Sequence, residues 1–169
     1  MRVELWFDFN KDTLETLTNL DEAINCFYHK SKVDVLFRSL PQSESNYLFH
    51  EAFQYGRRKG LGCNYLKTIF EIYFSNSDLL SSIDTKLNHF NLNLADLKSN
   101  LLHEKSKKIV LNQLEHAHLQ KISVAPTITF SHGFRLIGKK DINEIKKTLV
   151  MMYEKDSGIK YCIEEDCER

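Results

Sequence analysis

Two cysteines near the C-terminus are the residues of this sequence whose type and spacing could support redox chemistry. Cys162 and Cys167 are the ends of the segment Cys-Ile-Glu-Glu-Asp-Cys. A ring of this size can close if the two Cα atoms come within about 7 Å. The acidic side chains between the sulfurs disfavour the thiolate and should raise both pKa values. We therefore expect an easily oxidised pair rather than a fast nucleophile.

The other two cysteines are weaker candidates for chemistry. Cys26 lies on the apolar face of a predicted helix and is expected to be a buried core residue. Cys63 follows Gly60-Leu61-Gly62, near a predicted helix start. A helix N-terminus lowers the pKa of a thiol, so Cys63 is a secondary candidate for reactivity.

Metal ligation is not expected from this sequence. The four cysteines form no pair of CxxC units, and the seven histidines include no pair at i, i+4 and no HExxH motif. His116 and His118 stand two positions apart, so they face different ways on a helix. We expect no metal and no cofactor.

A predicted helix start near residue 12 is a candidate anion site. Helix N-termini carry free N–H groups and a partial positive charge, to which Lys11 and Thr13 would add a cation and a hydroxyl. Asp12 and Glu15 instead match a capping box, in which they would occupy the same N–H groups. We favour the interpretation as a cap.

The elements that must position these residues follow a simple order. Alternating apolar residues predict a strand at 2–9, and apolar residues at helical spacing predict a helix from Asp12 to Phe27. A second strand follows at 33–37, and the pattern is helical from 47 to 119. Strands at 122–130 and 134–137 precede a last helix that is capped by Asp141.

This order predicts an α/β fold with a four-stranded mixed sheet. The first strand–helix–strand unit requires a parallel pair, and the two later strands form a hairpin. A length of 169 residues suits one domain. We expect residues 1–41 and 120–155 to form the core, 46–119 a large helical insertion, and 156–169 a tail.

Composition argues against two classes of partner. The 23 basic and 23 acidic side chains cancel, so no positive field favours nucleic acid or a membrane surface. No apolar run approaches the roughly 18 residues of a membrane helix. The N-terminus lacks the apolar stretch of a signal peptide, so a cytoplasmic location is expected.

Three segments resemble the DsbA/FrnE-like family of thioredoxin-fold proteins. Val3-Glu4-Leu5-Trp6-Phe7-Asp8-Phe9 resembles the first strand, which in the family ends just before a CxxC motif. Val124-Ala125-Pro126-Thr127-Ile128 resembles the Val-Pro-Thr element. Cys162 and Cys167 resemble the Cys-x4-Cys tail of some FrnE-like members. The resemblance implies a DsbA-like fold, with the helical insertion inside a thioredoxin-like core.

The resemblance also implies a site. In the family the proline is cis and faces the start of the first helix, where backbone pairs with an extended substrate. Here this groove would consist of Lys11, Asp12, Thr13, Ala125, Pro126 and Thr127. A protein or peptide partner is therefore expected there. The departure is that residues 11–14 read Lys-Asp-Thr-Leu, without the two cysteines that thiol exchange requires.

Three functions stay open. The first is a thiol-disulfide oxidoreductase with an atypical site, in which Cys162 and Cys167 are the redox pair. The second is a catalytically inactive binding or adaptor module, like the protease adaptors with degenerate DsbA-like folds, that keeps the cis-proline groove. The third and weakest is an enzyme similar to kappa-class glutathione transferases and 2-hydroxychromene-2-carboxylate isomerases, using Asn10 or Thr13. Those relatives use serine at this position, and residues 11–14 contain none.

Overall fold

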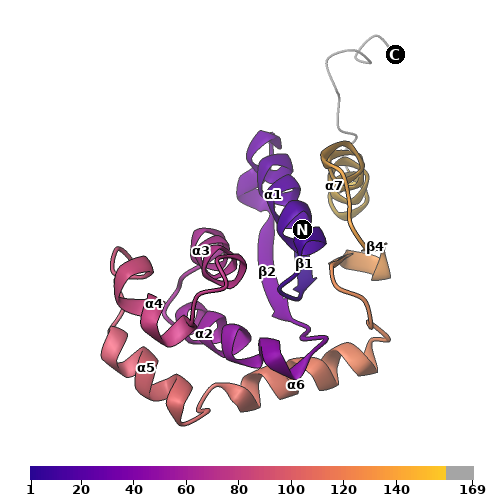
Figure 1. The fold of residues 1–169 in the computed structure, drawn as a ribbon. Coiled ribbons are helices and arrows are strands. Elements are labelled where there is room, and N and C mark those ends of the chain that lie inside the picture. The colour runs from indigo at the N-terminus through magenta and orange to yellow at the C-terminus, as the bar shows by residue number, and fades with distance from the viewer. Residues whose placement is uncertain (159–169) are drawn as a thin grey trace.

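The computed structural model describes residues 1–158, which form a four-stranded mixed sheet with helices on both faces (Figure 1). The strands lie in the order β2-β1-β3-β4. The first two are parallel, and the other pairs are antiparallel, as predicted. The strand bounds are β1 (Arg2–Phe7), β2 (Asp34–Ser39), β3 (Thr127–Phe130) and β4 (Arg135–Ile137).

Strand β1 is central and is covered on both faces. Val3 and Leu5 face the main core under α1 (Lys11–Cys26) and α7 (Ile142–Ser157), which pack against each other. Trp6 faces the opposite side, where it forms a smaller cluster with Ala117 and Ile122. Figure 1 shows α1 and α7 on one side of the sheet and α6 (Lys107–Leu119) on the other.

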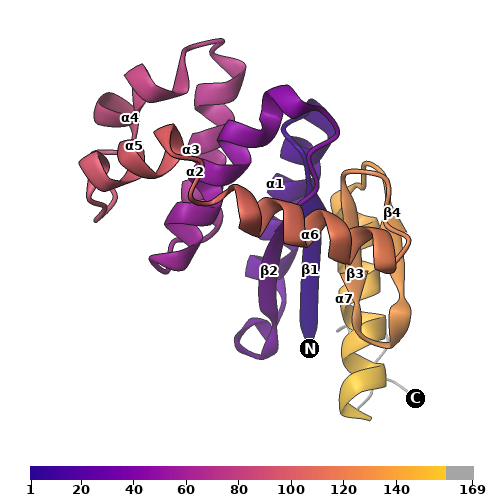
Figure 2. The same cartoon turned by 90° about the horizontal axis from the view of Figure 1, so that it is seen from below.

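The segment between β2 and β3 is helical, as predicted, apart from short loops. Its helices are α2 (Tyr47–Arg58), α3 (Cys63–Phe74), α4 (Leu79–Lys86), α5 (Leu94–Leu102) and α6 (Lys107–Leu119). Helices α2 to α5 gather beside the β2 edge, and α6 returns across the sheet toward β3 (Figure 2). A buried amide cluster ties this return to the sheet: Gln113 Oε1 accepts from the Ser39 N–H at 2.5 Å and from Gln54 Nε2 at 3.2 Å.

The contact between α2 and α3 depends on one glycine. Gly56 has no side chain, and the Tyr65 ring occupies the space where a Cβ would stand. Tyr65 is fully buried, and its hydroxyl donates to the Ala52 carbonyl at 3.0 Å. This close approach joins the apolar stripe of α3 to the core above the sheet.

The third strand is shorter than the predicted 122–130. Ile122 bonds through its N–H to the Ala117 carbonyl at 2.8 Å, and its side chain packs under Trp6. The chain then turns, and pairing with β1 begins at Thr127. Pro126 has no N–H to donate to a ladder, which is consistent with a strand that starts after it.

No helix within residues 1–158 is long and apolar enough to cross a membrane.

Candidate functional site

The start of α1 is capped by Asn10, and the predicted cap at Asp12 is wrong. Asn10 has an extended backbone, with φ −141° and ψ 166°, and its Oδ1 accepts from the Thr13 N–H at 2.8 Å. An N-cap residue needs this extended conformation, whereas Asp12 already lies inside the first turn. The helix therefore begins at Lys11, one residue earlier than the sequence suggests.

The three predicted residues of this turn differ in access to solvent. Lys11 and Asp12 are exposed. Thr13 is fully buried, and its Oγ1 has no hydrogen-bond partner among residues 1–158. The cap also occupies the Thr13 N–H. Of these three residues, only Lys11 and Asp12 are therefore open to solvent.

The second predicted segment, Ala125 to Thr127, forms a turn that leads into β3. The Ala125–Pro126 peptide bond is cis. Pro126 is buried, and its carbonyl accepts from the Gly138 N–H at 2.8 Å. Thr127 Oγ1 donates to the Val124 carbonyl at 2.6 Å. These two bonds fix the turn from both sides.

Ala125 differs from its neighbours because its own backbone is unpaired. Neither its N–H nor its C=O bonds to another group within residues 1–158, and the residue is partly exposed. A polar backbone group that is left open needs water or a partner. Ala125 therefore has one backbone donor and one backbone acceptor that are not used within residues 1–158.

Strand register brings the two predicted segments to the same end of the sheet. Trp6 pairs with Thr127, and β1 ends one residue later, at Phe7. Helix α1 starts a few residues beyond that end, and Ala125 lies just before Thr127. The structure thus places Lys11 and Asp12 at the end of the sheet where Ala125 and Pro126 lie.

The thiols among residues 1–158 are poor nucleophiles or lie elsewhere. Cys26 is exposed at the last position of α1, so the prediction of a core residue is wrong. Ala23 and Phe27 hold the buried positions of that turn. Cys63 begins α3 as expected, but burial and the Asp21 carboxylate raise its pKa to about 11. Cys162 and Cys167 lie outside the described residues.

A buried carboxylate beside the α1 start was missed by the sequence analysis. Asp8 Oδ1 accepts from the Phe9 N–H at 2.8 Å, from Asn46 Nδ2 at 2.9 Å and from His50 Nε2 at 3.0 Å. Its Oδ2 accepts from the Gln42 N–H at 3.1 Å. Asp8 thereby ties the strand–helix junction to the loop after β2 and to α2.

The protonation states of Asp8 and His50 follow from burial and hydrogen bonding. Burial alone would raise the pKa of Asp8, but the hydrogen bonds from His50 and Asn46 hold it below its usual range. Burial lowers the pKa of His50, although Asp8 opposes the shift. Because a carboxylate only accepts, the proton of neutral His50 is on Nε2. The pair is therefore an ionised Asp8 and a neutral His50 at pH 7.

The signal for Asp8 was present in the sequence, but the signal for its partners was not. A carboxylate at the end of the apolar run Leu-Trp-Phe-Asp-Phe requires buried donors. Asn46 and His50 lie on the far side of β2 in the sequence, and nothing in their spacing links them to Asp8.

Comparison with solved structures shows which fold this geometry belongs to. The match to a probable DsbA oxidoreductase from Streptomyces coelicolor covers 97% of this chain and 94% of the oxidoreductase chain, with a TM-score of 0.78 and 12% sequence identity. The match to BdbD from Bacillus subtilis covers 90% of this chain and 87% of BdbD, with a TM-score of 0.69 and 16% sequence identity. The match to a 2-hydroxychromene-2-carboxylate isomerase covers 95% of this chain and 100% of the isomerase, with a TM-score of 0.68 and 11% sequence identity.

The chain has a DsbA-like fold. No family model and no curated protein matches it in sequence. At these identities the likeness establishes the fold alone, and the thioredoxin-like sheet with its helical insertion is as predicted.

Within this DsbA-like fold, the turn that follows β1 contains no thiol. Residues 10–14 read Asn-Lys-Asp-Thr-Leu. Leu14, at the end of the segment where the resemblance places the CxxC motif, packs against the core. Within residues 1–158 no three His, Cys, Asp or Glu side chains are grouped so that they could hold a metal ion. The exposed side chains of this turn, Lys11 and Asp12, are thus charged groups without a thiol.

Proposed function

We propose that this protein is a peptide-binding module with a DsbA-like fold, which docks an extended chain on the backbone of Ala125. The observation that carries the proposal is the unpaired N–H and C=O of Ala125, beside the exposed Lys11 and Asp12. An extended peptide that bonds to both groups would add a short antiparallel or parallel pairing at the end of the sheet.

Two features of the site argue against thiol catalysis at α1. The turn lacks both cysteines, so no thiolate can attack and none can resolve a mixed disulfide. Among the described cysteines, Cys63 has its pKa raised to about 11, which leaves almost no thiolate at pH 7. Binding without exchange is what the remaining groups support.

The oxidoreductase alternative rests on Cys162 and Cys167. Its support is the fold, which this chain shares with a structure named as a probable DsbA oxidoreductase. The isomerase-like alternative has less support, because Thr13 is fully buried and Asn10 Oδ1 is occupied by the helix cap. Thr13 therefore cannot reach a ligand, and Asn10 Oδ1 already accepts a hydrogen bond.

A peptide selection tests the docking proposal. Peptides would be selected on the purified full-length protein from a phage-displayed random library, and the affinity of a selected peptide measured by fluorescence anisotropy. Ala125→Trp fills the edge and should weaken binding at least about tenfold. Because Ala125 packs against the cluster around Trp6, thermal melting verifies that the variant is folded. Tyr28→Ala, an exposed site beyond the other end of α1, is the matched control and should leave affinity unchanged.

Pairing with the Ala125 backbone can also be tested by modifying the backbone of the selected peptide. Methylation of the amide nitrogen that pairs with the Ala125 C=O should abolish binding, whereas methylation one residue away should not. Equal loss at both positions, or an Ala125→Trp variant that binds normally, would refute the proposal. Reduction of insulin at a catalytic rate that is lost in Cys162→Ser would instead establish the oxidoreductase alternative.

A further inference from the structure

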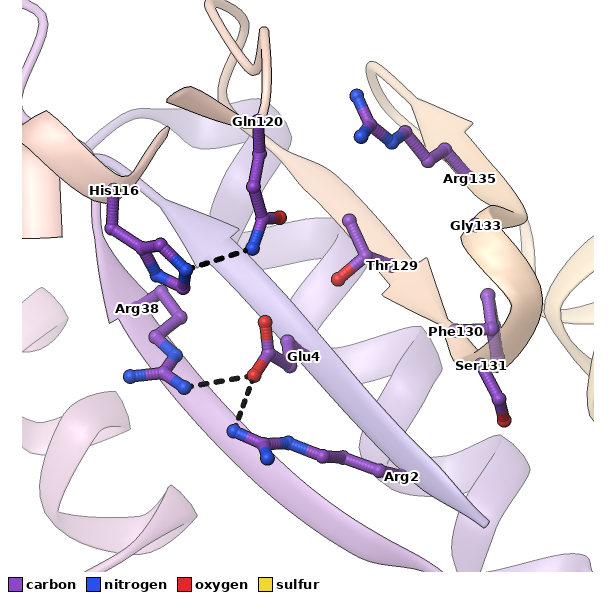
Figure 3. Close-up of a pocket in the computed structure, with 10 residues that line it drawn as sticks. All are labelled: Arg2, Glu4, Arg38, His116, Gln120, Thr129, Phe130, Ser131, Gly133 and Arg135. Atoms are coloured by element: carbon purple, nitrogen blue, oxygen red, sulfur yellow. Dashed lines mark hydrogen bonds and ion pairs between the residues drawn. The ribbon is translucent and has the colours of Figure 1, made fainter. Parts of the chain in front are cut away.

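A polar hollow of about 530 Å³ lies over the sheet, away from the docking edge at Ala125. Its floor is the sheet face that α6 covers only in part: Trp6 is buried under Ala117, while Glu4, two residues earlier on the same face, lines the hollow. His116 and Gln120, at the end of α6, form one wall (Figure 3).

Strand register arranges the floor of this pocket. Glu4 pairs with Thr129, and Thr129 pairs with Arg135, so three side chains stand in a row on one face. Arg2 is two residues from Glu4 on the same strand and shares its face. Arg38 reaches Glu4 from β2. Figure 3 shows Thr129 between Glu4 on one side and Arg135 on the other.

The pocket has more positive than negative charge. Arg2 and Arg38 both contact Oε1 of Glu4, at 2.6 and 2.8 Å. Arg135 forms no ion pair with any residue from 1 to 158. The pocket lining thus includes three guanidinium groups and one carboxylate, which is an excess of two positive charges among its Arg and Glu side chains.

The groups in the pocket also have unused hydrogen-bonding capacity. The Arg38 Nε–H is buried and has no partner within the described chain, while the Arg38 side chain is only 17% exposed. Burial, together with the charge of Arg38, lowers the pKa of the neighbouring Arg57. Thr129 Oγ1 has no hydrogen bond to another described residue, which adds a free hydroxyl at the centre.

We propose that this pocket binds a small dianion, a phosphate monoester or a dicarboxylate, between Arg38 and Arg135 over Thr129. Guanidinium groups bind both kinds of oxyanion through paired N–H donors. A volume of about 530 Å³ lies within the range of small-molecule sites. Two negative charges would balance the excess of the three arginines over Glu4.

Two sources can supply this chemistry. One is a free metabolite-sized anion. The other is the chain itself, because residues 159–169 include Glu164, Glu165 and Asp166. The described chain approaches the pocket rim at its C-terminal end: Ser131, which lines the pocket, donates to Asp156 of α7 at 2.8 Å. The experiment therefore has an arm for each source.

The chain contains its own reporter for the pocket. Trp6 is the single tryptophan of the sequence, and its ring centroid lies 5.8 Å from that of His116, which lines the pocket. Phenyl phosphate and succinate would each be titrated at constant ionic strength in chloride buffer, following Trp6 fluorescence and, in parallel, heat by calorimetry. Saturable binding with one ligand per chain is expected for at least one probe.

Two substitutions in the pocket test the site, and a third, outside it, is the control. Arg135→Gln, which breaks no ion pair among the described residues, should weaken the binding of the probe about tenfold. Glu4→Gln removes the competing carboxylate and should strengthen it. Lys147→Gln removes an equal charge from the exposed face of α7, across the sheet, and should have no effect. Thermal melting of each variant verifies that the fold is intact.

The outcomes separate cleanly. Tighter binding in the full-length variant Glu164→Gln/Glu165→Gln/Asp166→Asn assigns the pocket to the tail carboxylates, and unchanged affinity assigns it to the free anion. Either result supports the proposal. It is overturned if neither probe binds to the wild type or to the tail variant, or if Lys147→Gln weakens binding as much as Arg135→Gln. None of these measurements depends on peptide docking at Ala125.

Discussion

At the scale of single residues, Asp8 is the side chain whose environment is most specialised. It is 3% exposed and accepts four hydrogen bonds, from two backbone N–H groups and from Asn46 and His50. Because the donors from Phe9, Asn46 and His50 are buried, loss of the carboxylate leaves them unpaired. Asp8 therefore holds the turn between β1 and α1 in place.

Replacement of Asp8 by asparagine tests this role. Asp8→Asn should lower the free energy of unfolding by about 2–3 kcal/mol, since an amide cannot accept from donors on both of its atoms. Urea denaturation measures the difference. Asp34→Asn, at an exposed position of β2, is the matched control and should change stability by less than about 0.5 kcal/mol. Equal effects of the two substitutions would contradict the proposed role.

The buried His50 gives the fold a dependence on pH. Burial lowers its pKa in the folded state, so the unfolded state binds the proton more readily. The neutral, buried His50 therefore contributes to the free energy of unfolding at pH values above about 6.5, the pKa of histidine in the unfolded chain. This contribution is lost as the pH falls from about 6.5 toward the lower pKa of His50 in the folded state. Between pH 7 and 5, the unfolding free energy of the wild type should fall more steeply than that of His50→Gln. Parallel curves would show that His50 is not responsible.

At the scale of elements, the position of the α1 cap has a measurable consequence. Asn10→Ala removes the bond from Asn10 Oδ1 to the Thr13 N–H and should cost about 1 kcal/mol. Asp12→Asn keeps the size of the side chain and removes only a charge near the helix start, so it should cost at most about 0.5 kcal/mol. Chemical denaturation of both variants decides between the two caps. A larger effect at Asp12 would restore the predicted capping box.

The contact of α2 with α3 predicts a steric effect. Gly56→Ala places a methyl group inside the Tyr65 ring and should destabilise the protein by about 2–3 kcal/mol. In a Tyr65→Leu background the same change should cost much less, because the ring is gone. A double-mutant cycle by thermal unfolding measures this coupling. Additive effects would mean that the ring is not the obstacle.

The order and type of the elements could be predicted because they depend on local periodicity. The strand at β1, the helical segment between β2 and β3, and the Asp141 cap of α7 all follow from apolar spacing and side-chain type. Boundaries were less accurate because packing decides them. Ile122 suits a strand by type, yet it serves as core under Trp6. Cys26 lies one position from the buried Phe27 and faces solvent.

The two candidate sites differ in how much of them the sequence reveals. The segments at Lys11 and Pro126 were found because each resembles a family segment. The pocket of Arg2, Arg38 and Arg135 was not found, because its residues come from three strands and only their register unites them. From the sequence alone, a charged residue in a strand is predicted to face solvent. Only the neighbouring strands show which other charged residues lie beside it.

At the scale of the whole molecule, one apolar core joins the sheet to the helical segment. Phe7 and Ile128 of the sheet belong to the same buried cluster as Phe53 and Phe70 of α2 and α3. We therefore expect residues 1–158 to unfold in one cooperative step. Trp6 fluorescence reports on the sheet, and far-ultraviolet circular dichroism reports mainly on the helices. Their urea midpoints should coincide, and two separated midpoints would show that the helical segment unfolds independently.

The topology of the sheet has a consequence during synthesis on the ribosome. Strand β1 pairs with β2 on one side soon after it is made, but its other neighbour, β3, is encoded more than a hundred residues later. At ~5–20 residues per second, the second edge of the central strand waits on the order of ten seconds for its partner. During that interval the nascent chain presents an apolar strand with an open edge, which is a surface prone to aggregation. Early protection of this edge, by a chaperone or by the growing helical segment, should therefore raise the yield of folded protein.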